Sequence, residues 1–180
     1  MNSFAVFGLS VLMSFVAFGL TTKLYILPHL RSLPPDKALV PLILFHTTRF
    51  IGLSFLVPGV VSLSLPSAFA VPAAFGDLGA AVLAVAATLA VTEGAAWALA
   101  LVWLFNVWGT VDLLYGFYLG LVGIPGFDPT TLGAAFYLPT VIVPAYLVAH
   151  GLIFWLLPRA GRQRQTASGG VGRHYSLEVH

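Results

Sequence analysis

Five apolar stretches of helix length follow one another along the chain. Each is longer and poorer in charged residues than a helix of a water-soluble protein. They cover residues 4–27, 39–61, 73–91, 95–122 and 130–157. A helix needs about 20 apolar residues to cross a bilayer, and helices satisfy their own backbone polar groups there. The sequence therefore predicts an all-α fold, an integral membrane bundle of five transmembrane helices in one domain at residues 1–158.

The scarcity of charge excludes a soluble protein. Charged residues make up 8% of the 180 residues and hydrophobic ones 59%, whereas a soluble domain carries about 25% charged residues. We therefore expect the lipid bilayer as the main partner and no nucleic acid. Cysteine is absent, which excludes disulfides, cysteine-ligated zinc and iron–sulfur clusters.

The basic residues predict how the helices are oriented. Lys23, Arg31 and Lys37 lie at or after the end of the first stretch, and four arginines follow the last one at positions 159, 162, 164 and 173. Basic residues mark the cytoplasmic side of a membrane protein. We therefore expect the N-terminus outside and the C-terminus in the cytoplasm. Residues 159–180 are predicted to form a basic flexible tail that is partly an expression remnant.

The second stretch carries His46 and Arg49 near its middle. An ionised arginine at the centre of a bilayer costs about 2.5–3.5 kcal/mol even on the most lenient scale, so it requires a partner. Asp77 in the third stretch and Asp112 in the fourth are the carboxylates at similar depth. We predict that Arg49 pairs with Asp112, and that Asp77 joins this pair or lines water from the outer side.

Asn106 and His150 lie at about the depth of His46, toward the cytoplasmic side of Arg49. One hypothesis is a polar pocket of Arg49, Asp77, Asp112, His46 and Asn106 that binds a small ligand or passes protons or solutes. A second is a structural or assembly subunit whose Arg/Asp network only packs helices. A third is an electron-transfer protein in which His46 and His150 ligate haem b from opposite faces.

Sequence motifs for catalysis are missing. The chain has no Gly-x-Ser-x-Gly, no His-Glu-x-x-His and no phosphate-binding glycine loop, so we assign no catalytic residue and no metal site and lean away from an enzyme. Gly116 and Gly120 form a small-xxx-small pattern, which lets another helix approach closely. The pattern predicts that this face contacts either a neighbouring helix of the same chain or a second copy in a homo-oligomer.

Three segments resemble an uncharacterised family of small bacterial multi-span membrane proteins. They read Phe45-His-Thr-Thr-Arg-Phe-Ile-Gly-Leu-Ser-Phe-Leu-Val-Pro-Gly-Val-Val, Phe69-Ala-Val-Pro-Ala-Ala-Phe-Gly-Asp77 and Phe105-Asn-Val-Trp-Gly-Thr-Val-Asp112. The resemblance implies no activity, cofactor or substrate. It implies a multi-pass protein of the bacterial inner (plasma) membrane.

Overall fold

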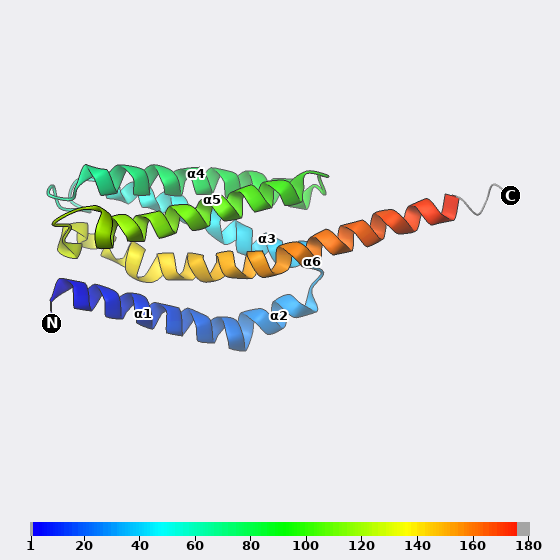
Figure 1. Ribbon diagram of the computed structural model, residues 1–180, viewed down its shortest axis with the longest axis horizontal. Coiled ribbons are helices and arrows are strands. Elements are labelled where there is room, and N and C mark those ends of the chain that lie inside the picture. The colour runs from blue at the N-terminus through cyan, green and yellow to red at the C-terminus, as the bar shows by residue number, and fades with distance from the viewer. Residues whose placement is uncertain (1, 176–180) are drawn as a thin grey trace.

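The computed structural model describes residues 2–175, and every regular element among them is helical. In chain order the elements are α1 (Ser3–Thr21), η1 (Thr22–Ile26), α2 (Leu27–Ser32), α3 (Pro35–Phe45), η2 (His46–Leu56), α4 (Ser67–Thr92), α5 (Ala98–Tyr118), η3 (Leu119–Gly123), η4 (Pro129–Phe136), η5 (Leu138–Ile142) and α6 (Val143–Tyr175). Of the η elements, η2 and η4 are 3₁₀-helices and the others are single π-helical turns. In Figure 1, α1 and α2 run along one edge of the bundle that α3 to α6 form.

Within residues 2–175, five helical segments are long and apolar enough to cross a membrane. They are Ser3–Ser32, Pro35–Leu56, Ser67–Thr92, Ala98–Gly123 and Leu138–Thr166. The predicted all-α class and the number of membrane-length helices are confirmed. The first helix continues past Pro28, which has no N–H to donate. The π turn η1 accommodates it, because the Leu27 amide bonds back to the Thr22 carbonyl oxygen.

The fifth helix begins at Leu138, whereas the sequence predicted a start at Thr130. Before it, η4 is interrupted at Gly133, whose φ is 54°. A side chain at Gly133 would collide with the carbonyl oxygen of Val60, which accepts from the Ala134 amide at 2.8 Å. The helix starts later than predicted because the chain in η4 turns back at Gly133 and forms a backbone hydrogen bond with Val60, in the segment that precedes α4.

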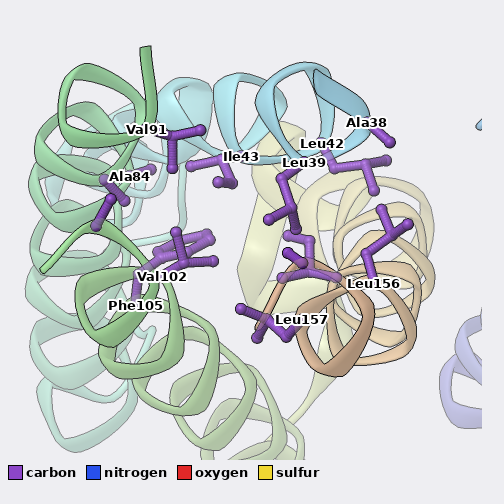
Figure 2. Close-up of a cluster of buried hydrophobic side chains, with 14 of the residues drawn as sticks. Ala38, Leu39, Leu42, Ile43, Ala84, Val91, Val102, Phe105, Leu156 and Leu157 are labelled. Atoms are coloured by element: carbon purple, nitrogen blue, oxygen red, sulfur yellow. The ribbon is translucent and has the colours of Figure 1, made fainter. Parts of the chain in front are cut away.

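The half of the bundle away from η4 is packed by apolar side chains from α3 to α6 (Figure 2). Leu39 and Ile43 of α3 meet Val102 and Phe105 of α5 there, and all four are fully buried. The facing side of α4 carries alanines such as Ala84, so α3 and α5 approach its backbone closely. This tight packing fixes α4, α5 and α6, which carry four of the polar residues described below, and α3, which leads directly into the segment that carries the other two.

The last helix continues to Tyr175, whereas the sequence predicted a flexible tail from residue 159. Arg164 anchors the extension by donating to Asp36 Oδ2 at 3.1 Å and to the Ala95 carbonyl oxygen at 3.2 Å. Asp36 lies in the first turn of α3, where the helix dipole favours a negative charge. The final part of the predicted tail, residues 176–180, lies outside the described residues.

Candidate functional site

Arg49 lies in η2, a 3₁₀-helix of 11 residues. Such helices rarely exceed about four residues, and their turn of about three residues aligns every third side chain. The buried residues of η2 are His46, Arg49, Gly52 and Phe55, which form one such row. An α-helix, with about 3.6 residues per turn, would turn His46 and Phe55 to opposite sides. The tight winding therefore directs the whole row into the bundle.

Each of the three nitrogens of the Arg49 guanidinium has at least one hydrogen-bond partner. Nε donates to Asp77 Oδ1 at 2.8 Å, and Nη2 lies 2.7 Å from that oxygen and 2.5 Å from Asp112 Oδ2. Nη1 donates to the Gly109 carbonyl oxygen at 3.1 Å and lies 3.3 Å from His150 Nε2. The structure thus contains the predicted pairing of Arg49 with Asp112, and Asp77 joins it.

Two carboxylates face this one guanidinium, so the cluster carries one unbalanced negative charge when both are ionised. Arg49 is completely buried, whereas the side chains of Asp77 and Asp112 are 13% and 14% exposed. An uncompensated charge in a site of low dielectric is costly. Because the two carboxylates are the partly exposed members of the cluster, the excess negative charge lies on its solvent-accessible side.

Three glycines on three different helices make room for the charged side chains. A Cβ at Gly52 of η2 would overlap the Asp77 side chain, and one at Gly76 of α4 would overlap the Asp112 carboxylate. A Cβ at Gly109 of α5 would stand 2.7 Å from Arg49 Nη1. Each glycine therefore lets a charged group lie directly against a helix backbone.

Asn106 sets the proton position on His150. Its amide nitrogen donates to the His150 carbonyl oxygen at 3.3 Å, and its amide oxygen lies 2.7 Å from His150 Nδ1. Because that oxygen can only accept, His150 Nδ1 carries the proton. His150 Nε2 is then free to accept from Arg49, so the inner polar residues are joined to the ion pairs.

His46 lies in the same cluster but is held differently. It is completely buried, and within the described part of the chain neither ring nitrogen has a hydrogen-bond partner. Its ring packs against His150 with centroids 4.0 Å apart, against Tyr146 at 5.0 Å and against Phe105 at 5.2 Å. His46 is therefore part of an aromatic stack.

The two histidines do not fit the hypothesis of a haem. Axial ligands on opposite faces must hold the porphyrin between their rings. His46 and His150 are already in direct contact, at a centroid distance below the usual range of about 4.5–7 Å for stacked aromatics. In addition, both nitrogens of His150 are within hydrogen-bonding distance of other groups. This arrangement leaves no space for the porphyrin between the rings.

A cavity of about 40 Å³ borders Asp77 and Asp112. Its wall includes five phenylalanines, Phe7, Phe55, Phe69, Phe117 and Phe127. A buried water requires about 10–15 Å³, and pockets for drug-sized ligands measure about 300–1,000 Å³. The cavity thus has room for a few water-sized molecules. Gly116 and Gly120 also line it, and the homo-oligomer expected from their spacing remains a prediction.

The loop carrying η4 covers one end of this cavity through Phe127 and Leu132. Asp128 caps the start of η4: the Thr130 amide donates to its carboxylate at 2.9 Å and lowers the pKa of that group below its usual value. Ser3 at the start of α1 also donates to Asp128, at 3.1 Å. These bonds connect the cover of the cavity to the first helix.

The structure brings all six predicted polar residues together in one connected cluster: His46, Arg49, Asp77, Asn106, Asp112 and His150. The sequence interpretation missed the steric role of Gly52, Gly76 and Gly109. A signal was present, because each glycine is either adjacent to a charged residue or three residues from one. It also missed the phenylalanine wall, whose five members come from five separate segments.

A pair of matched substitutions separates the two histidines. We expect His46→Phe to leave the thermal stability of the purified protein nearly unchanged, because its ring nitrogens form no hydrogen bond. We expect His150→Phe to lower the free energy of unfolding by about 1–3 kcal/mol, because Asn106 and Arg49 each lose a partner. Thermal unfolding in detergent measures both. Equal losses would contradict the assigned hydrogen bonds.

A comparison with known proteins places the chain in a family. A family model described as a domain of unknown function (DUF8737) matches residues 6–158, which include the whole candidate site. Neither the curated proteins nor the solved structures contain a match to the chain. The resemblance to an uncharacterised family is confirmed, and the chain belongs to the DUF8737 family.

Proposed function

We propose that this chain is a five-span membrane protein that binds and transfers protons at Asp77 and Asp112. The observation that carries the proposal is that two carboxylates share one guanidinium and both border the same cavity. A single added proton removes the unbalanced negative charge. The energetic cost of an uncompensated charge in a membrane interior makes this protonation the favoured way to neutralise the cluster.

The lining of the cavity favours a proton over a metal ion. Sodium or calcium requires several oxygen ligands, as hard cations do. Apart from Asp77 and Asp112, the residues that line the cavity are apolar or glycine. A proton needs only one carboxylate oxygen, and a few waters are sufficient to deliver it. The small volume also argues against a larger organic substrate.

The distribution of charge supports an orientation for the proposed protein. Arg31 and Lys37 lie where α2 meets α3, and Arg159 and Arg162 lie about halfway along α6. The cavity lies toward the opposite end, where η4 forms its cover. By the positive-inside rule the cavity faces outward, with the N-terminus outside and the C-terminus in the cytoplasm of a bacterial inner membrane.

Proton flux into liposomes tests this function. The purified protein is reconstituted with an internal pH-sensitive dye, and a potassium gradient with valinomycin supplies the driving potential. We expect protein-containing liposomes to acidify faster than empty ones, and Asp112→Asn to return the rate to background. Glu93→Gln removes an exposed carboxylate in the turn before α5, and this control should retain the wild-type rate.

A further variant tests the route to the carboxylates. Gly116 lines the cavity, and a Cβ added there meets no atom within 4 Å. We expect Gly116→Leu to fill the cavity and slow the flux without disturbing Arg49. A wild-type rate that equals that of empty liposomes, or that requires sodium, would overturn the proton proposal.

The structural role is the second candidate, and one observation favours it. Every nitrogen of the Arg49 guanidinium has a hydrogen-bond partner within the bundle, as in a network that fixes helix register. In that case Asp112→Asn would change stability while neither wild type nor variant carried protons. The liposome measurement therefore distinguishes the two candidates.

A further inference from the structure

An apolar groove separates the first helix from the rest of the bundle. It has a volume of about 560 Å³ and lies between the α1–η1–α2 segment on one side and α3 and α6 on the other. Phe18, Tyr25, Pro41, Phe45 and Leu152 are among its lining residues. The volume is within the range of pockets that hold ligands of about drug size, about 300–1,000 Å³. The mainly apolar lining suits an apolar occupant.

The groove exists because the first helix touches the bundle at few points. Phe7 in α1 and Leu30 in α2 are the buried residues of the segment from Ser3 to Ser32. Between these two contacts lies η1, the π turn beside Pro28. Local π turns change the direction of side chains along a helix. The segment around Tyr25 is left facing the groove instead of packing against α6.

A second pocket continues the groove at its basic end. It has a volume of about 370 Å³, shares Leu30 with the groove and is lined by Arg31, Trp155 and Arg159. The Arg159 guanidinium lies 3.5 Å from the centre of the Trp155 ring, which holds it at the pocket. Arg31 and Arg159 are both exposed.

The two adjoining pockets carry a positive charge that no lining residue balances. Within the described chain neither pocket is lined by an aspartate or a glutamate. Asp36, which lies nearby in α3, is bonded to Arg164 instead. An apolar groove that ends in two arginines matches an amphiphile with an anionic head.

We propose that this groove and pocket bind one anionic phospholipid, with an acyl chain in the groove and the phosphate between Arg31 and Arg159. Arginine suits this role because its planar fork donates two N–H groups to one phosphate. A basic pocket between helices at the membrane surface is a known form of anionic headgroup site. A zwitterionic lipid fits less well, because its ammonium group would lie near two guanidinium groups.

Lipid-dependent stabilisation tests the proposal independently of any proton transfer. The delipidated protein in detergent is heated with phosphatidylglycerol or with phosphatidylcholine of the same acyl chains. We expect phosphatidylglycerol to raise the unfolding temperature more strongly, and native mass spectrometry to find one such lipid per chain. Each of Arg31→Gln and Arg159→Gln should weaken phosphatidylglycerol binding about fivefold.

The control is Arg162→Gln, which removes the same charge from an exposed position of α6 outside both pockets. It should bind phosphatidylglycerol as the wild type does. Three results would overturn the proposal: equal stabilisation by both lipids, the same stabilisation by inorganic phosphate alone, or a delipidated dimer that covers the groove with a second copy.

Discussion

Replacing Arg49 with leucine is expected to lower the free energy of unfolding by about 3–5 kcal/mol, the usual cost of removing one partner from a buried ion pair. The physical reason is the two carboxylates left behind. Asp77 and Asp112 each lose their contact with the guanidinium, and both remain largely buried. Reversible unfolding in detergent, followed by circular dichroism, measures the loss.

A triple variant shows whether charge or packing causes that loss. Arg49→Leu with Asp77→Asn and Asp112→Asn removes all three charges and keeps the aspartate side chains nearly the same size. We expect it to recover most of the lost stability, because a neutral site leaves no unpaired charge in the bundle. If the triple variant is as unstable as Arg49→Leu, the shape of arginine rather than its charge supports the fold.

Replacing Gly76 with alanine is expected to break the pairing of Arg49 with Asp112. The new methyl group would overlap the Asp112 carboxylate, so that side chain must move. We expect a loss of about 1–3 kcal/mol in stability, the usual cost of overpacking, and a proton flux near background. The substitution would otherwise stabilise the helix by about 0.5–1 kcal/mol, so a loss points to the carboxylate.

Gly79→Ala is the matched control, because it lies three residues further along α4. A Cβ there would be 3.5 Å from Trp108, an ordinary contact distance. This variant should be as stable as the wild type or slightly more stable, with unchanged flux. Equal losses in the two variants would show that α4 tolerates no methyl group on this side, whatever lies opposite.

Much of the architecture followed from simple rules, because apolar length alone determines which segments can cross a bilayer. The partners of Arg49 were predictable for a similar reason: a buried guanidinium requires carboxylates at its own depth, and the third and fourth stretches offered Asp77 and Asp112. The contact between His150 and Arg49 was not predicted, since helix depth alone assigned them to different layers.

Other features depend on packing that the sequence does not express. The sequence placed the start of the fifth helix at Thr130 because it does not reveal that the helical path is broken at Gly133, which lies against the backbone of Val60. The 3₁₀ winding of η2 leaves no clear pattern in an apolar segment. The cavity was also unpredictable, since the phenylalanines that wall it lie far apart along the chain.

The winding of η2 determines both the length of the second span and the direction in which its side chains point. A 3₁₀-helix rises about 2.0 Å per residue and an α-helix about 1.5 Å, so rewinding these 11 residues would shorten the span by about 5 Å. The same rewinding would carry Phe55 to the side opposite His46 and remove one wall of the cavity. A change in the winding of η2 would therefore alter both the length of this span and the lining of the cavity beside Asp77 and Asp112.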